Sequence, residues 1–204
     1  MNIKSKKGMT LVEVIATVAI MAAIMVPISL IFTTAYSNFI TESDKSTAQK
    51  SARAVLYGKG LYGNGSISYG VMGDLQRSNV GGSKIVITEL FDGNKGRIIS
   101  IFDDNGLLYK YSFDSVKLML GYEYRDAEGK YVKEDDYFNN DPSDKKEIKV
   151  LKFSVEKKEK GTDIDKDPNT KTFIDNDLIE VYVEVECGKS GKIALESSYR
   201  IPIE

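Results

Sequence analysis

The sequence predicts an α+β fold, in which one long N-terminal helix, first transmembrane and then amphipathic, packs on an antiparallel β-sheet head domain. Three observations predict this fold. The chain is almost continuously apolar over residues 9–32, it lacks proline and glycine over residues 33–57, and later segments alternate apolar and polar residues between turn signals. We therefore expect a helix from about Met9 to Tyr57, ended by Gly58, with strands beyond residue 83.

Composition excludes several classes of function. The 204 residues are 42% hydrophobic and 28% charged, which is an ordinary globular average. With 28 Lys and Arg against 30 Asp and Glu, the chain has no basic stripe of the kind that binds nucleic acid. Histidine is absent and Cys187 is the single cysteine, which excludes internal disulfides, cysteine-rich zinc sites and catalysis by an imidazole.

The N-terminal segment combines a basic leader with an apolar stretch. Residues 1–8 contain Lys4, Lys6 and Lys7, and the next 24 residues would span about 36 Å as a helix, enough to cross a hydrocarbon core of about 30 Å. Because lysines precede this single span and a polar region follows it, we expect the N-terminus in the cytoplasm and the head outside.

Two ordinary explanations of this segment leave features unexplained. A secretory signal peptide has a shorter apolar core, and the small-residue cleavage site near its end would be Ala35-Tyr36-Ser37. A plain membrane anchor leaves Glu13 in the apolar stretch, where an acidic residue costs up to about 3 kcal/mol at mid-bilayer. Alternatively, Glu13 lies at the helix N-terminus, where the helix dipole favours it, and its carboxylate reaches the headgroups.

A third explanation rests on the run Lys6-Lys7-Gly8-Met9-Thr10-Leu11-Val12-Glu13-Val14. This run resembles the class III leader and cleavage box of type IV prepilins and type II secretion pseudopilins. In that family a membrane aspartyl peptidase cuts after the glycine, on the cytoplasmic face, and methylates the new N-terminus. The resemblance implies cleavage between Gly8 and Met9, methylation of Met9, and Glu13 as the fifth mature residue, although phenylalanine is commoner where Met9 stands.

The resemblance also implies partners and a role for Glu13. The partners are other pilin subunits, the prepilin peptidase, the pilus assembly platform and the membrane. A carboxylate held in lipid is neutralised most readily by a cation at the same depth, and cleavage creates such a cation in the α-amine of Met9. This amine could belong to a neighbouring subunit.

Two segments are expected to depart from regular structure. Pro27 removes one backbone hydrogen bond, and we expect it to kink or loosen the helix. Residues 58–82 hold eight glycines, so we expect a loop packed on the domain rather than a continuous regular element. The helix face from Tyr36 to Leu56 is expected to cover the sheet, which gives one α+β domain over residues 33–204.

The strands are expected where β-rich or alternating runs lie between turn signals. These segments are 85–90, 97–102, 107–113, 116–124, 129–133, 151–156, 179–186 and 193–203. The first three are joined by turn sequences at 92–96 and 103–106, which predicts a meander of hairpins.

One loop of the head carries the single cofactor hypothesis. Asp163, Asp165 and Asp167 present carboxylates at alternate positions, as calcium loops do. An EF-hand needs glycine where Pro168 stands and glutamate where Ile174 stands, so that motif fails. The remaining hypotheses are an irregular calcium site and a solvated loop without metal.

The other polar and aromatic residues of the head predict no catalytic site. Cys187 has no histidine to activate it and is expected to be structural. Residues 134–136 and Asp141 favour a surface charge run, beside which Tyr131, Tyr137 and Phe138 could form a contact patch.

These features predict a non-enzymatic subunit of a type IV pilus or related pseudopilus, stored in the cytoplasmic membrane and assembled into a cell-surface filament. The expected domains are a leader (1–8), a transmembrane and filament-core helix (9–32), and a head (33–204) with an amphipathic helix (33–57) and a β-rich region (83–204). The elaborate sheet resembles minor pilins of the J or W kind. The cysteine pair that closes the C-terminal region of many Gram-negative pilins is missing, which is consistent with a Gram-positive or anaerobic source. The alternatives are a signal-anchored extracellular binding or adhesin domain that does not polymerise and, third, an anchored hydrolase.

Overall fold

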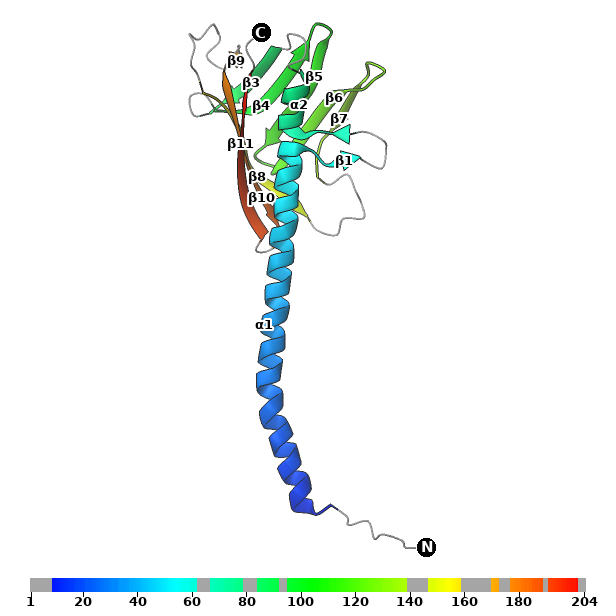
Figure 1. Ribbon diagram of the computed structural model, residues 1–204, viewed down its shortest axis with the longest axis vertical. Helices are drawn as coiled ribbons and strands as arrows, with labels where there is room; N and C mark the ends of the chain where they lie inside the picture. The colour runs from blue at the N-terminus through cyan, green and yellow to red at the C-terminus, as the bar shows by residue number, and fades with distance from the viewer. Residues whose placement is uncertain are drawn as a thin grey trace. The chain divides into compact units, whose positions relative to one another are not determined.

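The computed structural model describes residues 9–61, 67–78, 84–91, 95–138, 147–158, 170–172, 177–188 and 191–201. Contacts within the chain divide it into two compact units, Met1–Glu42 and Ser43–Glu204, and we call the second unit the head. The fold is α+β, as predicted: it combines a long N-terminal apolar helix with an antiparallel sheet (Figure 1).

The N-terminal helix, α1, runs from Leu11 to Tyr57 and ends where the sequence predicts. It remains helical through Pro27, so the proline does not end the helix, although Figure 1 shows α1 bending in its N-terminal half. Proline removes one N–H donor, but the neighbouring turns keep their own hydrogen bonds and hold the backbone helical. Gly58 ends the helix with a φ of 90°, a left-handed conformation that favours glycine, and its N–H donates to the Ala54 carbonyl at 2.8 Å.

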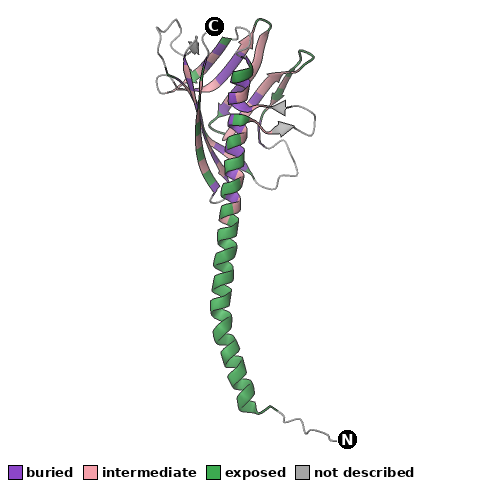
Figure 2. Ribbon diagram, viewed as in Figure 1, coloured by how far each residue is buried: buried purple, intermediate pink, exposed green. Residues whose placement is uncertain are grey.

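Burial in α1 is confined to its last four turns (Figure 2). The buried residues are Asp44, Ala48, Ser51, Ala52, Val55 and Leu56. Tyr36 and Phe39 are instead 63% and 72% exposed. Burial in α1 therefore starts at Asp44, in the second unit, and the predicted start of the head at residue 33 stays a prediction.

A second helix, α2 (Gly70–Ser78), lies in the segment that we predicted to be an irregular loop. Val71 and Leu75 of this helix are fully buried, which anchors it in the head. The glycine that suggested a loop is required by a close contact. Gly70 has a φ of 69°, and a Cβ there would lie 2.3 Å from the backbone nitrogen of Gly58. Glycine therefore allows the start of α2 to pack against the end of α1.

The strands form two groups. In chain order they are β1 (Gly60–Leu61), β2 (Ile67–Ser68), β3 (Lys84–Leu90), β4 (Lys95–Asp103), β5 (Gly106–Asp114), β6 (Met119–Arg125), β7 (Tyr131–Glu134), β8 (Ile148–Lys158), β9 (Thr170–Thr172), β10 (Leu178–Cys187) and β11 (Gly191–Arg200). β1 pairs with β2, and the other nine form one sheet in the order β11-β10-β8-β4-β5-β6-β7, with β3 paired to β4 and β9 to β3. Antiparallel pairing from β3 through β7 confirms the predicted meander.

The sheet departs from the sequence predictions in three places. Val116, expected in a strand, lies in the β5–β6 turn, where the backbone N–H groups of Val116 and Lys117 donate to Asp114 Oδ1 at 2.9 and 3.0 Å. β9 was not predicted, because three residues are too few to display an alternating pattern. β8 continues the sheet next to β4 through pairing at Lys95 and Gly96, a long-range contact that no local pattern reveals.

The core of the head lies between the sheet and the helical segments. Fully buried residues from each part are Leu56 of α1, Leu75 of α2, Ile99 of β4, Phe153 of β8 and Val183 of β10. At Asp44, α1 approaches the start of β11 so closely that a Cβ on Gly191 would lie 2.4 Å from the carbonyl carbon of Asp44. The glycine at position 191 thus permits the close approach of helix and sheet.

Two aromatic residues that we expected on the surface belong to this core. Tyr137 and Phe138 are buried, and the Tyr137 hydroxyl donates to the Ala54 carbonyl at 2.9 Å. Asp136 of the expected surface charge run is also buried and accepts from the Phe138 N–H at 3.0 Å. The contact-patch prediction is therefore wrong for Tyr137 and Phe138. Cys187 is fully buried in the core.

Candidate functional site

A reciprocal cap between Thr10 and Glu13 holds the first turn of α1. The backbone N–H and the hydroxyl of Thr10 donate to Glu13 Oε2 at 2.8 and 3.0 Å, and the Glu13 N–H donates back to Thr10 Oγ1 at 3.3 Å. This arrangement is a capping box, and a carboxylate in the first turn also interacts favourably with the helix dipole. Glu13 therefore has hydrogen-bond partners within its own chain.

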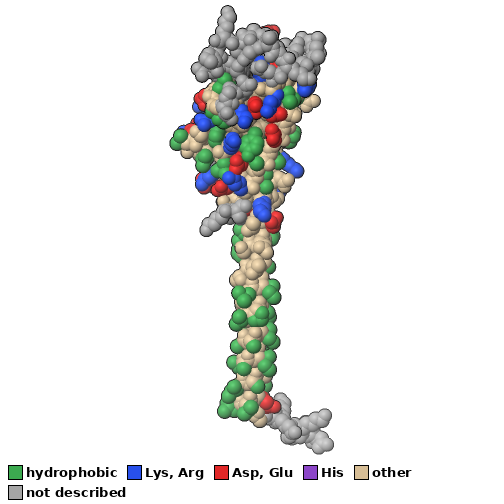
Figure 3. Space-filling model, turned by 90° about the vertical axis from the view of Figure 1, so that its left-hand side faces the viewer, with side chains coloured by type: hydrophobic (Ala, Val, Ile, Leu, Met, Phe, Trp, Pro, Cys, Tyr) green, Lys and Arg blue, Asp and Glu red, His purple; other side chains and the backbone are tan. Residues whose placement is uncertain are grey.

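Beyond this cap, α1 presents an apolar surface. The large apolar side chains of residues 14–32 are exposed, and Figure 3 shows apolar side chains along the helix, whereas charged side chains gather on the head. The Thr17 hydroxyl donates back to the carbonyls of Glu13 and Val14 at 3.0 and 2.8 Å, so it needs no outside partner. Within the described residues, α1 is the one helix long and apolar enough to cross a membrane.

The other residues predicted for processing or metal binding lie at the edge of the described structure or outside it. Met9 is exposed and precedes the cap. Gly8 and the calcium candidates Asp163, Asp165 and Asp167 lie outside the described residues. In the described ranges, no group of three or more acidic or cysteine side chains is placed to hold a metal ion.

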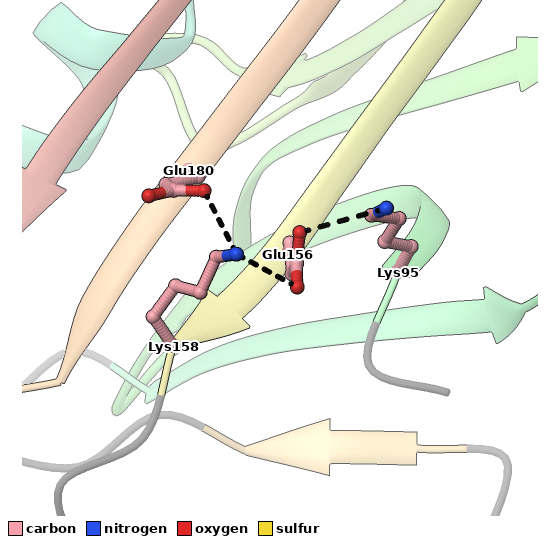
Figure 4. Close-up of polar contacts among 4 residues, drawn as sticks. All are labelled: Lys95, Glu156, Lys158 and Glu180. Carbon is pink, nitrogen blue, oxygen red and sulfur yellow. Dashed lines mark ion pairs between the residues drawn. The ribbon is translucent and has the colours of Figure 1, made fainter. Parts of the chain in front are cut away.

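The solvent face of the sheet carries a network of opposite charges (Figure 4). Lys158 Nζ lies 3.2 Å from Glu156 and 3.4 Å from Glu180, and Lys95 Nζ lies 3.9 Å from Glu156. Glu156 and Glu180 stand directly opposite each other on β8 and β10, so the lysines offset a repulsion between like charges.

A hollow of about 290 Å³ lies over this network and is also lined by Lys152, Ser154, Tyr182 and Glu196. The lining contains both lysines and glutamates, so the hollow has no excess of positive or negative charge. Lys95, Glu156, Lys158 and Glu180 already form ion pairs with one another. Exposed pairs of this kind contribute little to stability, about 0–1 kcal/mol each. We therefore assign no ligand to this hollow.

A buried carboxylate, Asp74 of α2, forms a polar cluster inside the head. Its Oδ2 accepts hydrogen bonds from the hydroxyls of Tyr111 (2.6 Å) and Tyr122 (3.2 Å), whereas no hydrogen-bond donor in the described part of the chain reaches its Oδ1. Burial raises the pKa of Asp74 to about 6, against the lowering effect of the two tyrosine hydroxyls and the Arg77 charge. Burial also raises the pKa of Tyr111 well above its ordinary value.

Sequence reasoning missed both Thr10 as a cap and Asp74 as a buried acid. The first was accessible, because Thr-x-x-Glu before an apolar run is the pattern of a capping box. The second was not, because the residues that enclose Asp74 come from β5 and β6, far along the chain. Nothing in the glycine-rich sequence on either side of Asp74 indicates that its side chain is buried.

Comparison with known protein families finds a prokaryotic N-terminal methylation motif over residues 3–29, a range that includes Gly8, Met9 and Glu13. No curated protein and no solved structure matches the chain significantly. The motif and the apolar helix support a type IV pilin-like precursor that is anchored in a membrane. They also favour a structural protein over an enzyme.

Proposed function

We propose that this chain is a structural subunit of a type IV pilus or related pseudopilus, cleaved between Gly8 and Met9 and assembled through α1. The observation that carries this proposal is the methylation motif, which extends over the first part of a capped apolar helix whose large side chains are exposed. Such a surface needs lipid before assembly and other helices after it. The precursor has its N-terminus in the cytoplasm and its head outside the cell.

We propose that Glu13 has a second partner in the filament. Leader removal creates an α-amine on Met9, and pairing this cation with the Glu13 carboxylate of a neighbouring subunit would neutralise both charges in apolar surroundings. Thr10 donates to Oε2 of the Glu13 carboxylate. A carboxylate offers several acceptor sites, so the cap and the intersubunit pair are compatible.

The head favours a minor subunit. Its elaborate nine-stranded sheet resembles minor pilins, and the two helical segments and the sheet form their own core. We propose that the chain is a low-abundance subunit of the J or W kind. A direct count of its copies per filament, relative to the major subunit, tests this assignment.

Processing is tested by the intact mass of protein extracted from membranes of a cell that contains a prepilin peptidase. The mature chain should begin at Met9 and carry one additional methyl group. Gly8→Val should leave the leader attached, because a branched side chain replaces hydrogen at the cut. A mature chain that begins at Tyr36, Ser37 or Asn38 would instead identify an ordinary signal peptide.

Assembly is tested by variants that separate the cap from the charge. Glu13→Gln keeps a capping-box residue but removes the charge, Thr10→Ala removes the cap but keeps the charge, and Glu13→Val removes both. If pairing with Met9 drives assembly, recovery of the protein in sheared filaments should fall sharply for both Glu13 variants. It should stay close to wild type for Thr10→Ala. Immunoblots normalised to membrane-stored protein measure this recovery.

The second candidate is a signal-anchored extracellular binding or adhesin domain that does not polymerise. One observation favours it: the Thr10–Glu13 cap gives Glu13 a role even in a plain anchor, although the sequence alone suggested that an anchor has no use for this residue. Equal incorporation of wild type and Glu13→Gln would reject the charge-pairing proposal. Absence of the wild-type protein from purified filaments would favour the anchored domain.

A further inference from the structure

We propose that Tyr36, Phe39 and Ile40, which we call the outer anchor, bind the outer headgroup layer of the membrane and fix the depth of α1 in the stored precursor. This inference rests on the proposed membrane-stored state. It assigns a lipid-binding role to residues that we first expected to cover the sheet.

The outer anchor is an apolar cluster on one side of the helix. Residues 36, 39 and 40 have the i, i+3, i+4 spacing that places side chains on one face of a helix. Tyr36 and Phe39 are largely exposed, and Ile40 is 41% exposed. Burial in the head starts only at Asp44. These three side chains therefore need another partner to cover them.

The spacing of charges along α1 identifies this partner as the membrane interface. Between Glu13 and Glu42 the sequence has no charged residue, which leaves 28 residues from Val14 to Thr41. As a helix they span about 42 Å, which matches the roughly 40–45 Å of a bilayer with its headgroups better than the roughly 30 Å of the hydrocarbon core alone. The uncharged part of α1 therefore has the length of the whole membrane.

The same lengths place the outer anchor within the membrane. A core about 30 Å thick holds about 20 helical residues, and centred in the uncharged stretch it corresponds to about residues 18–37. Tyr36 then lies at the outer edge of the core, and Phe39 and Ile40 lie in the headgroup layer among small polar residues. Tyrosine is enriched at this level because its ring is apolar and its hydroxyl is polar.

Side-chain direction brings the aromatic rings closer to the lipid. Helical side chains point toward the N-terminus of their helix, which here is the direction of the membrane. The rings of Tyr36 and Phe39 therefore reach back by part of a turn from their own Cα atoms. With the outer anchor in the outer headgroups, Glu13 and the Gly8–Met9 bond lie at the opposite interface, where the proposed cut is made.

The test uses the full-length chain in vesicles of phosphatidylethanolamine and phosphatidylglycerol, and it exploits the absence of tryptophan from the sequence. Three variants, Phe39→Trp, Ile24→Trp and Tyr57→Trp, each carry a unique fluorophore at a position that is exposed in the chain. Quenching is measured with lipids brominated near the headgroup, with lipids brominated near the bilayer centre, and with aqueous acrylamide.

The outer anchor predicts three different results. Phe39→Trp should be quenched several-fold more by headgroup-proximal bromines than by central ones. Ile24→Trp should show the opposite preference, and Tyr57→Trp should respond to acrylamide alone. Replacing Tyr36 and Ile40 with serine should weaken lipid quenching of Phe39→Trp, whereas replacing Ser37 and Asn38 with alanine should not.

The outcomes separate this inference from the proposed function. If Ile24→Trp is quenched by lipid but Phe39→Trp responds only to acrylamide, the membrane-stored state stands and the outer anchor is wrong. If lipid does not quench Ile24→Trp, the stored state itself fails. If Phe39→Trp escapes lipid quenching and loses acrylamide quenching as the protein-to-lipid ratio rises, a second copy covers this face and the lipid assignment is overturned.

Discussion

The two units of the chain differ in where they place apolar side chains, although α1 contributes to both. In Met1–Glu42 the large apolar residues from Val14 to Phe32 are exposed, whereas in the head the apolar residues of α1, α2 and the sheet form one buried cluster. The head therefore supplies its own apolar environment. The N-terminal part is completed by lipid or by other helices, so mutations in the two units should have different kinds of effect.

The strongest test of this comparison is truncation at the boundary between the units. A chain that begins at Ser43 should be soluble and should unfold in urea at the same midpoint as a chain that begins at Thr33. A chain that begins at Lys59 should not fold, because it lacks the buried side chains of α1. Burial of a valine or leucine contributes about 1.5–3 kcal/mol, and a domain has only about 5–15 kcal/mol in total. Equal stability of the Lys59 and Ser43 chains would refute packing of α1 on the sheet.

The next largest effect is expected where α1 meets α2. Gly70→Ala introduces a Cβ 2.3 Å from the Gly58 nitrogen at a φ of 69°, and it should lower the free energy of unfolding by about 3 kcal/mol through strain and crowding. The matched control is Gly129→Ala, at a φ of 82° with no atom within 4 Å, which should cost about 1 kcal/mol from strain alone. Urea titrations of the head compare them, and similar losses would argue against the close contact.

The buried Asp74 predicts a pH dependence that belongs to the head alone. Because its pKa is raised from 3.8 to about 6 in the folded state, the protonated acid is favoured by folding. This contribution is full below pH 4 and is lost as the pH rises toward 6, which amounts to about 3 kcal/mol.

Asp74→Asn should abolish this part of the pH dependence, because an amide does not titrate in this range. The measurement is the free energy of unfolding of wild type and variant at several pH values from 4 to 7. Taking the difference between the two proteins cancels the opposite effect of Asp103 and Asp114, whose pKa values are lowered mainly by hydrogen bonds. Parallel curves for the two proteins would show that Asp74 does not titrate in this window.

The smallest effect is expected from two hydroxyl groups that join α1 to the rest of the head. Tyr137→Phe removes the hydrogen bond to the Ala54 carbonyl and should cost about 1 kcal/mol. Tyr57→Phe removes an exposed hydrogen bond of 2.9 Å to Ser197, and the solvent can replace it, so its cost should be smaller. Unfolding midpoints resolve this order, and a larger loss for Tyr57→Phe would reverse our assignment of which contact is protected from water.

The parts of the fold that the sequence predicts are those controlled by local signals. The helix end at Gly58, the hairpins of the β3–β7 meander and the alternation in β10 each depend on a turn residue or on a period of two. The motif at residues 3–29 could also be recognised from the sequence, because its residues are contiguous.

The errors arise where distant residues decide the structure. Gly70 suggested a loop, but it starts α2 because the end of α1 lies too close for a side chain. Tyr137 was expected on the surface because it follows a run of acids, yet the Ala54 carbonyl provides a partner inside the head. Tyr36 fits the helical period as well as Val55 does, yet Tyr36 is exposed and Val55 is buried, a difference that the period alone does not predict.

The position of the Thr10–Glu13 cap has a consequence for the maturation that we propose. The hydrogen bonds of the cap use atoms of Thr10 and Glu13 alone, so they lie entirely on the mature side of a cut between Gly8 and Met9. The peptidase would add a positive charge to the end of the chain without removing a hydrogen bond that starts the helix. Precursor and product would then share one helix geometry, and maturation would change the charge at the start of the helix without changing its conformation.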